Sequence, residues 1–139
     1  MLNPSPYGWI SQYFVGFFFA YGVYLPFWAL WFEEQGVSAT DIGLLVGIGF
    51  ATRCVANMVL TPRIHKVEHL MPALRWLSIA ALIFIGFHFF TGGSFWLMAG
   101  ATVLFNLCCG PIVPLSDAMA NYYARLKMLD YGRARLWGS

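Results

Sequence analysis

A single cationic residue interrupts a long apolar run of the sequence. Arg53 lies eleven residues after Ile42 and seven before Leu60, offsets of about 16 and 10 Å along a helix. An arginine near the middle of a bilayer costs about 2.5–3.5 kcal/mol on insertion scales. It therefore needs compensation from a hydrated cavity, a carboxylate, a bound anion or carbonyl groups of another helix. Gly49, Arg53 and Asn57 share one helical face. We therefore interpret Arg53 either as part of a transport pathway or as a structural arginine with polar neighbours.

A second polar stripe ends in a carboxylate. Asn106, Gly110, Val113 and Asp117 follow helical spacing, and Pro111 and Pro114 interrupt the same run. Proline frees backbone carbonyls that only water or protein can satisfy inside a membrane. Broken helices that line a cavity are common in transporters. The alternative is a kinked packing helix whose Asp117 only reaches the lipid headgroups.

Other residues suggest contacts rather than chemistry. Gly43 and Gly47 lie four residues apart and are followed by Ala51, a spacing that lets two helices approach closely. The ring of Tyr21 is suited to stacking on a substrate or to anchoring at the membrane interface. His88 fits a packed or interfacial histidine better than a proton relay.

Catalysis has no candidate site in this sequence. It contains no Ser-His-Asp arrangement and no paired carboxylates, and its three cysteines lie in apolar runs without zinc-ligand spacing. We therefore expect no enzymatic activity, no metal and no cofactor. The net charge of +2 is too small to indicate nucleic-acid binding.

The composition indicates that these residues are positioned by transmembrane helices. Apolar residues make up 60% of the 139 residues and charged residues only 10%, against roughly 45–50% and 25% in soluble proteins. Long apolar runs without two-residue alternation predict an all-α, polytopic membrane protein. We expect four antiparallel helices at approximately 9–32, 42–61, 73–91 and 94–117, with Pro62 and Pro72 at helix ends. A loop over 118–132 and the start of a fifth helix over 133–139 follow.

The basic residues predict the orientation. Of the eight Lys and Arg residues, all but Arg53 lie in the connector after the second helix and its margin, or in the tail after the fourth. The first and third connectors hold none, and the first carries Glu33 and Glu34. The positive-inside rule therefore places the N-terminus, the second connector and the tail in the cytoplasm, with the chain in a bacterial inner membrane.

Two stretches and a short run resemble a known family. They are residues 24–32 (YLPFWALWF), residues 130–138 (DYGRARLWG) and the Pro-Leu-Ser-Asp run at 114–117. The chain resembles, over essentially its whole length, the lactose-permease-like branch of the major facilitator superfamily, and within it the 3-phenylpropionate permease group.

The resemblance implies a transporter that works by alternating access with twelve helices in two halves. It also implies that Asp117 and Arg135 form part of a substrate site, because an acidic residue on the fourth helix and an arginine on the fifth do so in that branch. Arg133 and Arg135 are two residues apart and point to opposite sides of a helix. The chain would then be a truncated N-terminal transmembrane domain whose partner is the missing C-terminal half, which generally carries the proton-coupling carboxylates.

We therefore expect proton-coupled uptake of a small organic solute, an aromatic carboxylate such as phenylpropionate. The proposed substrate site comprises Asp117, Arg135, Arg53, Tyr21 and Asn106, supported by Asn57, Pro111, Pro114, Gly43 and Gly47. A sugar or a nucleoside is the alternative substrate. The alternative functions are a small four-helix exporter that dimerises, and a membrane scaffold or gene remnant that transports nothing.

Overall fold

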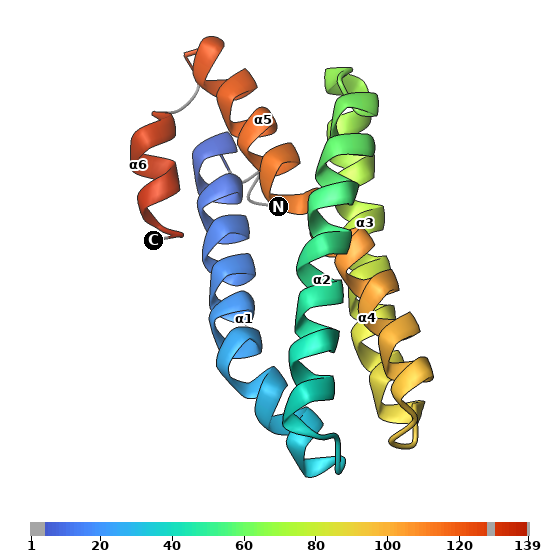
Figure 1. The fold of residues 1–139 in the computed structure, drawn as a ribbon. Coiled ribbons are helices and arrows are strands. Elements are labelled where there is room, and N and C mark those ends of the chain that lie inside the picture. Colours follow the sequence, from blue (N-terminus) through green and yellow to red (C-terminus); the bar gives the residue numbers. More distant parts are fainter. Residues whose placement is uncertain (1–4, 128–129, 139) are drawn as a thin grey trace.

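The computed structural model describes residues 5–127 and 130–138, and this part of the chain is helical without a strand (Figure 1). The elements are α1 (Pro6–Glu34), α2 (Ala39–Val59), η1 (Thr61–Arg63), α3 (Val67–Phe87), η2 (His88–Phe90), α4 (Phe95–Cys109), α5 (Ile112–Arg125) and α6 (Tyr131–Leu136). Four stretches are long and apolar enough to cross a membrane: Pro6–Glu34, Ala39–Arg63, Val67–Phe90 and Phe95–Arg125. The predicted all-α membrane fold is confirmed.

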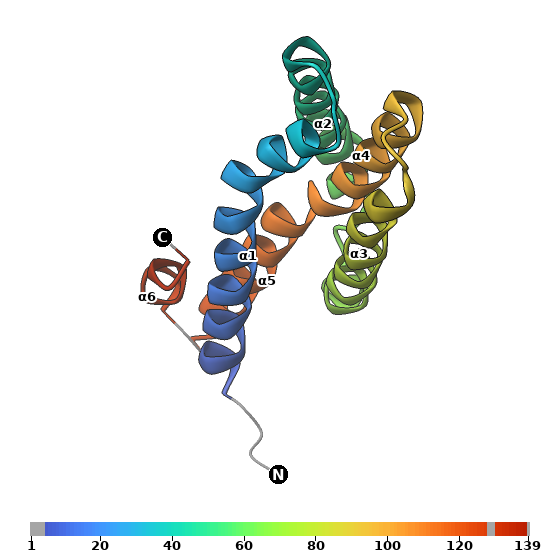
Figure 2. The same cartoon turned by 90° about the horizontal axis from the view of Figure 1, so that it is seen from below.

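The helices run up and down, but sequence neighbours are not always packed together. α4 lies between α2 and α3 and packs against both, and α5 continues from it along α3 (Figure 2). α1 curves toward α2 in its second half, where Pro26 lies inside the helix (Figure 1). α6 lies beside α1, on the side away from α2 (Figure 1).

The fourth span is broken in the middle. α4 ends at Cys109, Gly110 caps it, and Pro111 is the N-cap of α5. Pro114 falls in the first turn of α5, where the backbone N–H groups have no partner within the helix and a proline costs little. Of the two prolines expected to interrupt this helix, only Pro111 lies at the break.

Several predicted boundaries need correction. The third helix starts at Val67 instead of 73 and keeps Pro72 inside it, so this proline does not mark a helix start. The segment 118–125, expected as loop, is the second half of α5, and α6 already begins at Tyr131. Asp130 caps α6 by accepting hydrogen bonds from the backbone N–H groups of Gly132 and Arg133, which explains the earlier start.

The connectors are short because their residues permit tight turns. Ser38 caps α2, and its hydroxyl oxygen accepts a hydrogen bond from the backbone N–H of Asp41 at 3.2 Å. Gly36 and Gly93 have a φ of 78°, a left-handed conformation that glycine adopts without steric cost. We call the end of the bundle that holds the 35–38 connector the acidic end, and the opposite end the basic end.

Two clusters of buried side chains hold the bundle together. A large cluster joins α1, α3, α5 and α6 and includes Phe14, Leu74, Leu115 and Ala134. A small one near the acidic end consists of Phe32, Leu45 and Met98, all fully buried, with Trp28 and Trp31 packed against it. Large side chains elsewhere point outward; Trp96 and Phe90 are each 81% exposed, which suits lipid as the surrounding medium.

Candidate functional site

Arg53 faces the interior of the bundle and is held by three neighbours. Its Nη1 donates a short hydrogen bond to the Tyr21 hydroxyl on α1, and its guanidinium carbon lies 4.8 Å from the centre of that ring. Its Nη2 donates to Asn106 Oδ1 at 3.1 Å and lies 3.7 Å from Cys109 Sγ, both on α4. The compensation that the sequence required for this cation is therefore provided by α1 and α4.

α2 and α4 approach closely at the level of this network. A Cβ atom built on Gly49 would lie 2.9 Å from Asn106 Nδ2 and 3.3 Å from Thr102 Cγ2. One built on Gly110 would lie 3.0 Å from Arg53 Cγ. These two glycines therefore bring the arginine against the fourth span.

The predicted contact face at Gly43, Gly47 and Ala51 is not found among the described residues. All three are exposed, and a Cβ built on either glycine meets nothing within 4 Å. The four-residue spacing identified a face of small residues, but this face points away from the bundle. The seam with α4 instead uses the neighbouring face of α2, which carries Gly49 and Arg53.

Two cavities meet at Tyr21 and Arg53. The larger, about 310 Å³, is open and lies toward the basic end; its polar wall consists of Tyr21, Arg53, Asn57, Thr61 and Asp117. Phe17, Phe18, Cys109, Gly110, Val113 and Pro114 complete its lining. The smaller, about 50 Å³, lies toward the acidic end and includes Trp28, Phe32, Leu45 and Asn106 in its lining. A cavity of a few hundred Å³ is of the size that small ligands occupy.

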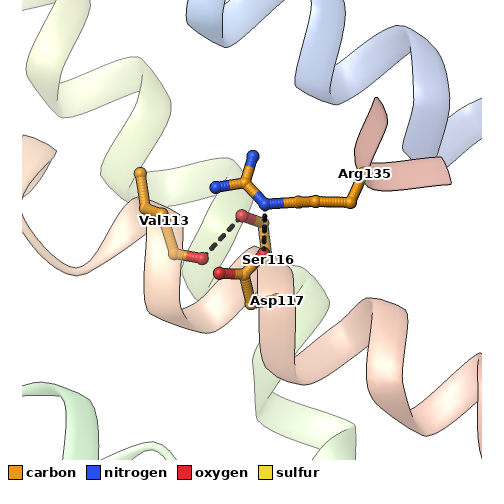
Figure 3. Close-up of polar contacts among 4 residues, drawn as sticks. All are labelled: Val113, Ser116, Asp117 and Arg135. Atoms are coloured by element: carbon orange, nitrogen blue, oxygen red, sulfur yellow. Dashed lines mark hydrogen bonds and ion pairs between the residues drawn. The ribbon is translucent and has the colours of Figure 1, made fainter. Parts of the chain in front are cut away.

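Asp117 and Arg135 lie together, as Figure 3 shows. Arg135 Nε is 3.4 Å from Asp117 Oδ1, and the side chains are 30% and 28% exposed. This separation exceeds the usual length of a charge-assisted hydrogen bond, and the oxygen accepts no hydrogen bond from the described residues. The Ser116 hydroxyl, on the residue before Asp117, donates to the Val113 carbonyl at 2.8 Å (Figure 3).

Aromatic rings of α1 support the guanidinium of Arg135. Its central carbon lies 4.5 Å from the centre of the Phe18 ring and 5.1 Å from that of Phe14. Cation–π contacts of this kind attract the arginine while leaving its terminal nitrogens accessible. Arg133, two residues earlier on α6, is exposed.

The structure brings most of the predicted site residues to the larger cavity or next to it. Arg53, Asn57, Tyr21, Pro114 and Asp117 line the larger cavity. Asn106 lines the smaller one, and Arg135 reaches the site through Asp117. Pro111 is fully buried at the helix break, while Gly43 and Gly47 line neither cavity.

Three residues of the candidate site, Thr61, Phe14 and Phe18, were not predicted from the sequence. Thr61 lies eight residues after Arg53 and continues the four-residue spacing of Arg53 and Asn57, which could have revealed it. Phe14 and Phe18 resemble any other apolar residues of the first span, and only the placement of α6 shows what they support.

His88 belongs to the packed interior near the acidic end. It is 1% exposed, its Nδ1 lies 3.0 Å from the Phe84 carbonyl oxygen, and its Nε2 lies 3.2 Å from the Thr102 hydroxyl. The indole ring of Trp28 contacts it edge-on at a centroid distance of 4.7 Å. In residues 5–127 and 130–138, no three His, Cys, Asp or Glu side chains gather closely enough to hold a metal ion.

Four helical stretches long and apolar enough to cross a membrane, around a cavity with charged and aromatic walls, define the class of polytopic membrane proteins. Comparison with known proteins identifies the family: the sequence profile of the MFS_1 like family matches residues 8–139. The chain therefore belongs to this family of the major facilitator superfamily.

Two curated relatives are transporters by name. The chain is 39% identical over 132 residues to the probable 3-phenylpropionic acid transporter of Escherichia coli (strain K12), covering 94% of this chain and 34% of the relative. It is 30% identical over 124 residues to the maltose permease of Geobacillus stearothermophilus, covering 88% of this chain and 31% of that protein. The chain thus spans about a third of the length of these relatives. No solved structure matches it.

Proposed function

We propose that this chain is part of a transporter that takes up a small organic solute, an aromatic carboxylate such as phenylpropionate, together with a proton and by alternating access. The observation that carries the proposal is the larger cavity, which combines Arg53 and Asp117 with the rings of Phe17, Phe18 and Tyr21. Aromatic walls suit an aryl ring, and an arginine suits a carboxylate. The relative named for 3-phenylpropionic acid supports the same substrate class.

Arg135 is the proposed partner of the substrate carboxylate. The terminal nitrogens of Arg53 are engaged with Tyr21, Asn106 and Cys109, whereas Arg135 pairs through its Nε and is 30% exposed. The ion pair with Asp117 uses Nε, and the two terminal nitrogens are the proposed donors of a bidentate contact with a carboxylate.

The proposed orientation places the basic end, and with it the opening of the larger cavity, in the cytoplasm of a bacterial cell. The connector around Arg63 and Lys66 and the end of α5 at Arg125 lie at this end, as the positive-inside rule requires. The fully buried cluster of Phe32, Leu45 and Met98 lies at the opposite end. A second, C-terminal half would be the partner that completes the pathway.

Binding of radiolabelled 3-phenylpropionate to the chain in lipid nanodiscs tests this function. We expect Arg135→Ala to weaken binding by about tenfold or more, the loss of a hydrogen-bonded charge contact. Arg133→Ala removes the same side chain from an exposed position of the same helix, and we expect it to bind like the wild type. Equal binding by both variants and the wild type would remove Arg135 from the site.

A further inference from the structure

Four polar side-chain atoms at the larger cavity have no hydrogen-bond partner among the described residues. They are Arg53 Nε, Asn57 Oδ1, Thr61 Oγ1 and Asp117 Oδ1. In the part of the chain that the structure describes, only two other buried side-chain atoms share this property, Ser11 Oγ and Trp28 Nε1, and neither residue lines this cavity. A buried polar atom without a partner is unfavourable, because it has lost its hydrogen bonds with water. Their concentration at one cavity indicates that a bound group completes the hydrogen bonds.

Three of these residues form a row along one helix. Arg53, Asn57 and Thr61 recur every four residues, so they follow one another along α2 and its continuation in η1. Asp117 on α5 lines the same cavity. We call these four residues the polar row. All four residues line the cavity, and side-chain rotation is what would bring these atoms to a group bound there.

The atom types determine which group fits. Asn57 Oδ1 and the carboxylate oxygen of Asp117 only accept hydrogen bonds, Arg53 Nε only donates, and the Thr61 hydroxyl does both. A carboxylate in this place would leave two acceptors unpaired and would add a second anion beside Asp117. A hydroxyl group donates to an acceptor and accepts from Arg53 Nε or Thr61.

We infer that the polar row is a subsite for a hydroxyl group of the transported solute. The inference rests on the proposed function and narrows its substrate class to hydroxylated aromatic acids, which bind their hydroxyl group at the polar row and their carboxylate at Arg135. Hydroxyl groups of a sugar offer the same chemistry, so the test includes one.

The experiment compares three solutes on the chain in lipid nanodiscs by equilibrium dialysis: 3-phenylpropionate, 3-(4-hydroxyphenyl)propionate and maltose. The wild type is expected to bind the hydroxylated acid about tenfold more tightly than the plain acid, the effect of a hydrogen bond to a charged site. Asn57→Leu and Thr61→Val each remove polar atoms at similar volume. We expect both to reduce this preference, the ratio of the two affinities, toward one.

Thr52→Val is the matched control. The Thr52 hydroxyl donates to the Ile48 carbonyl of its own helix at 2.8 Å, and the residue does not line the larger cavity. The same chemical change on the same helix should therefore preserve the preference for the hydroxylated acid. Circular dichroism of each variant shows whether the helical fold is retained.

Each outcome decides a different point. Equal binding of the two acids to the wild type, or a preference that persists in both Asn57→Leu and Thr61→Val, would overturn the subsite and leave the proposed function standing. Binding of maltose alone, weakened by both variants, would support the subsite and overturn the aromatic-acid function. Failure of all three solutes to bind would overturn both.

Discussion

The two arginines at the site differ in what surrounds their guanidinium groups. The terminal nitrogens of Arg53 contact Tyr21 on α1 and Asn106 and Cys109 on α4. Because Arg53 itself lies on α2, these contacts link α1, α2 and α4 at the cavity wall. The guanidinium of Arg135 lies over the rings of Phe14 and Phe18, and its Nε is 3.4 Å from the Asp117 carboxylate, longer than a usual charge-assisted hydrogen bond. The first arrangement is suited to holding a structure and the second to exchanging partners.

The pair of Asp117 and Arg135 is expected to contribute little to stability. The two side chains are 30% and 28% exposed, and their closest atoms are 3.4 Å apart. Exposed ion pairs contribute roughly 0.2–1 kcal/mol. A double-mutant cycle of Asp117→Ala and Arg135→Ala, measured as the free energy of unfolding in detergent, should give a coupling in this range. A coupling of several kcal/mol would mark the pair as structural.

At the scale of the element, the seam between α2 and α4 determines where Arg53 lies. Gly49 and Gly110 allow the two helices to approach, and the break between Cys109 and Ile112 lets the fourth span change direction before it reaches Asp117. The cavity is lined on both sides of this break, by Cys109 and Gly110 from one side and by Val113, Pro114 and Asp117 from the other.

Substituting Gly49 tests this seam. Gly49→Ala places a Cβ at 2.9 Å from Asn106 Nδ2, and we expect it to reduce the free energy of unfolding by about 1–3 kcal/mol, as overpacking does. Gly47→Ala is the control two residues away, where an added Cβ meets nothing within 4 Å. It should leave stability unchanged or slightly raised, since alanine favours helix over glycine. The same loss in both variants would show that the contact with α4 at Gly49 does not cause the destabilisation.

At the scale of the whole molecule, the two ends of the bundle differ in how their side chains pack. The fully buried cluster of Phe32, Leu45 and Met98 lies toward the acidic end, and the cavity of about 310 Å³ lies toward the basic end. α1 contributes only four buried residues, Ile10, Ser11, Phe14 and Phe32. Much apolar surface of this helix therefore faces outward, which suits lipid as the surrounding medium.

The proposed orientation predicts which connectors face which side of the membrane. With Cys54, Cys108 and Cys109 replaced by alanine, single cysteines are introduced as Gln35→Cys at the acidic end and His65→Cys at the basic end; both positions are exposed. A membrane-impermeant maleimide should label position 35 only in right-side-out vesicles and position 65 only in inverted ones. The opposite pattern would reverse the topology.

The sequence alone was sufficient for the features that depend on local chemistry. The length and polarity of each apolar run determine that it spans a bilayer, so the number and type of the spans could be predicted. The isolated charge of Arg53 required internal partners, which the structure provides on α1 and α4. The resemblance of residues 130–138 to a permease segment led to the pair of Asp117 and Arg135, which the structure brings to 3.4 Å.

The tertiary structure decided what depends on how helices rotate and pack against one another. A four-residue spacing of glycines indicates a face of small residues, but Gly43 and Gly47 face outward while Gly49 forms the contact with α4. Two prolines in one run indicate a disturbed helix, but only the geometry shows that the break falls at Pro111. The meeting of Arg53, Asn57, Thr61 and Asp117 at one cavity joins residues from two helices distant in sequence. Such contacts depend on the relative placement of whole helices, which no local pattern of residues encodes.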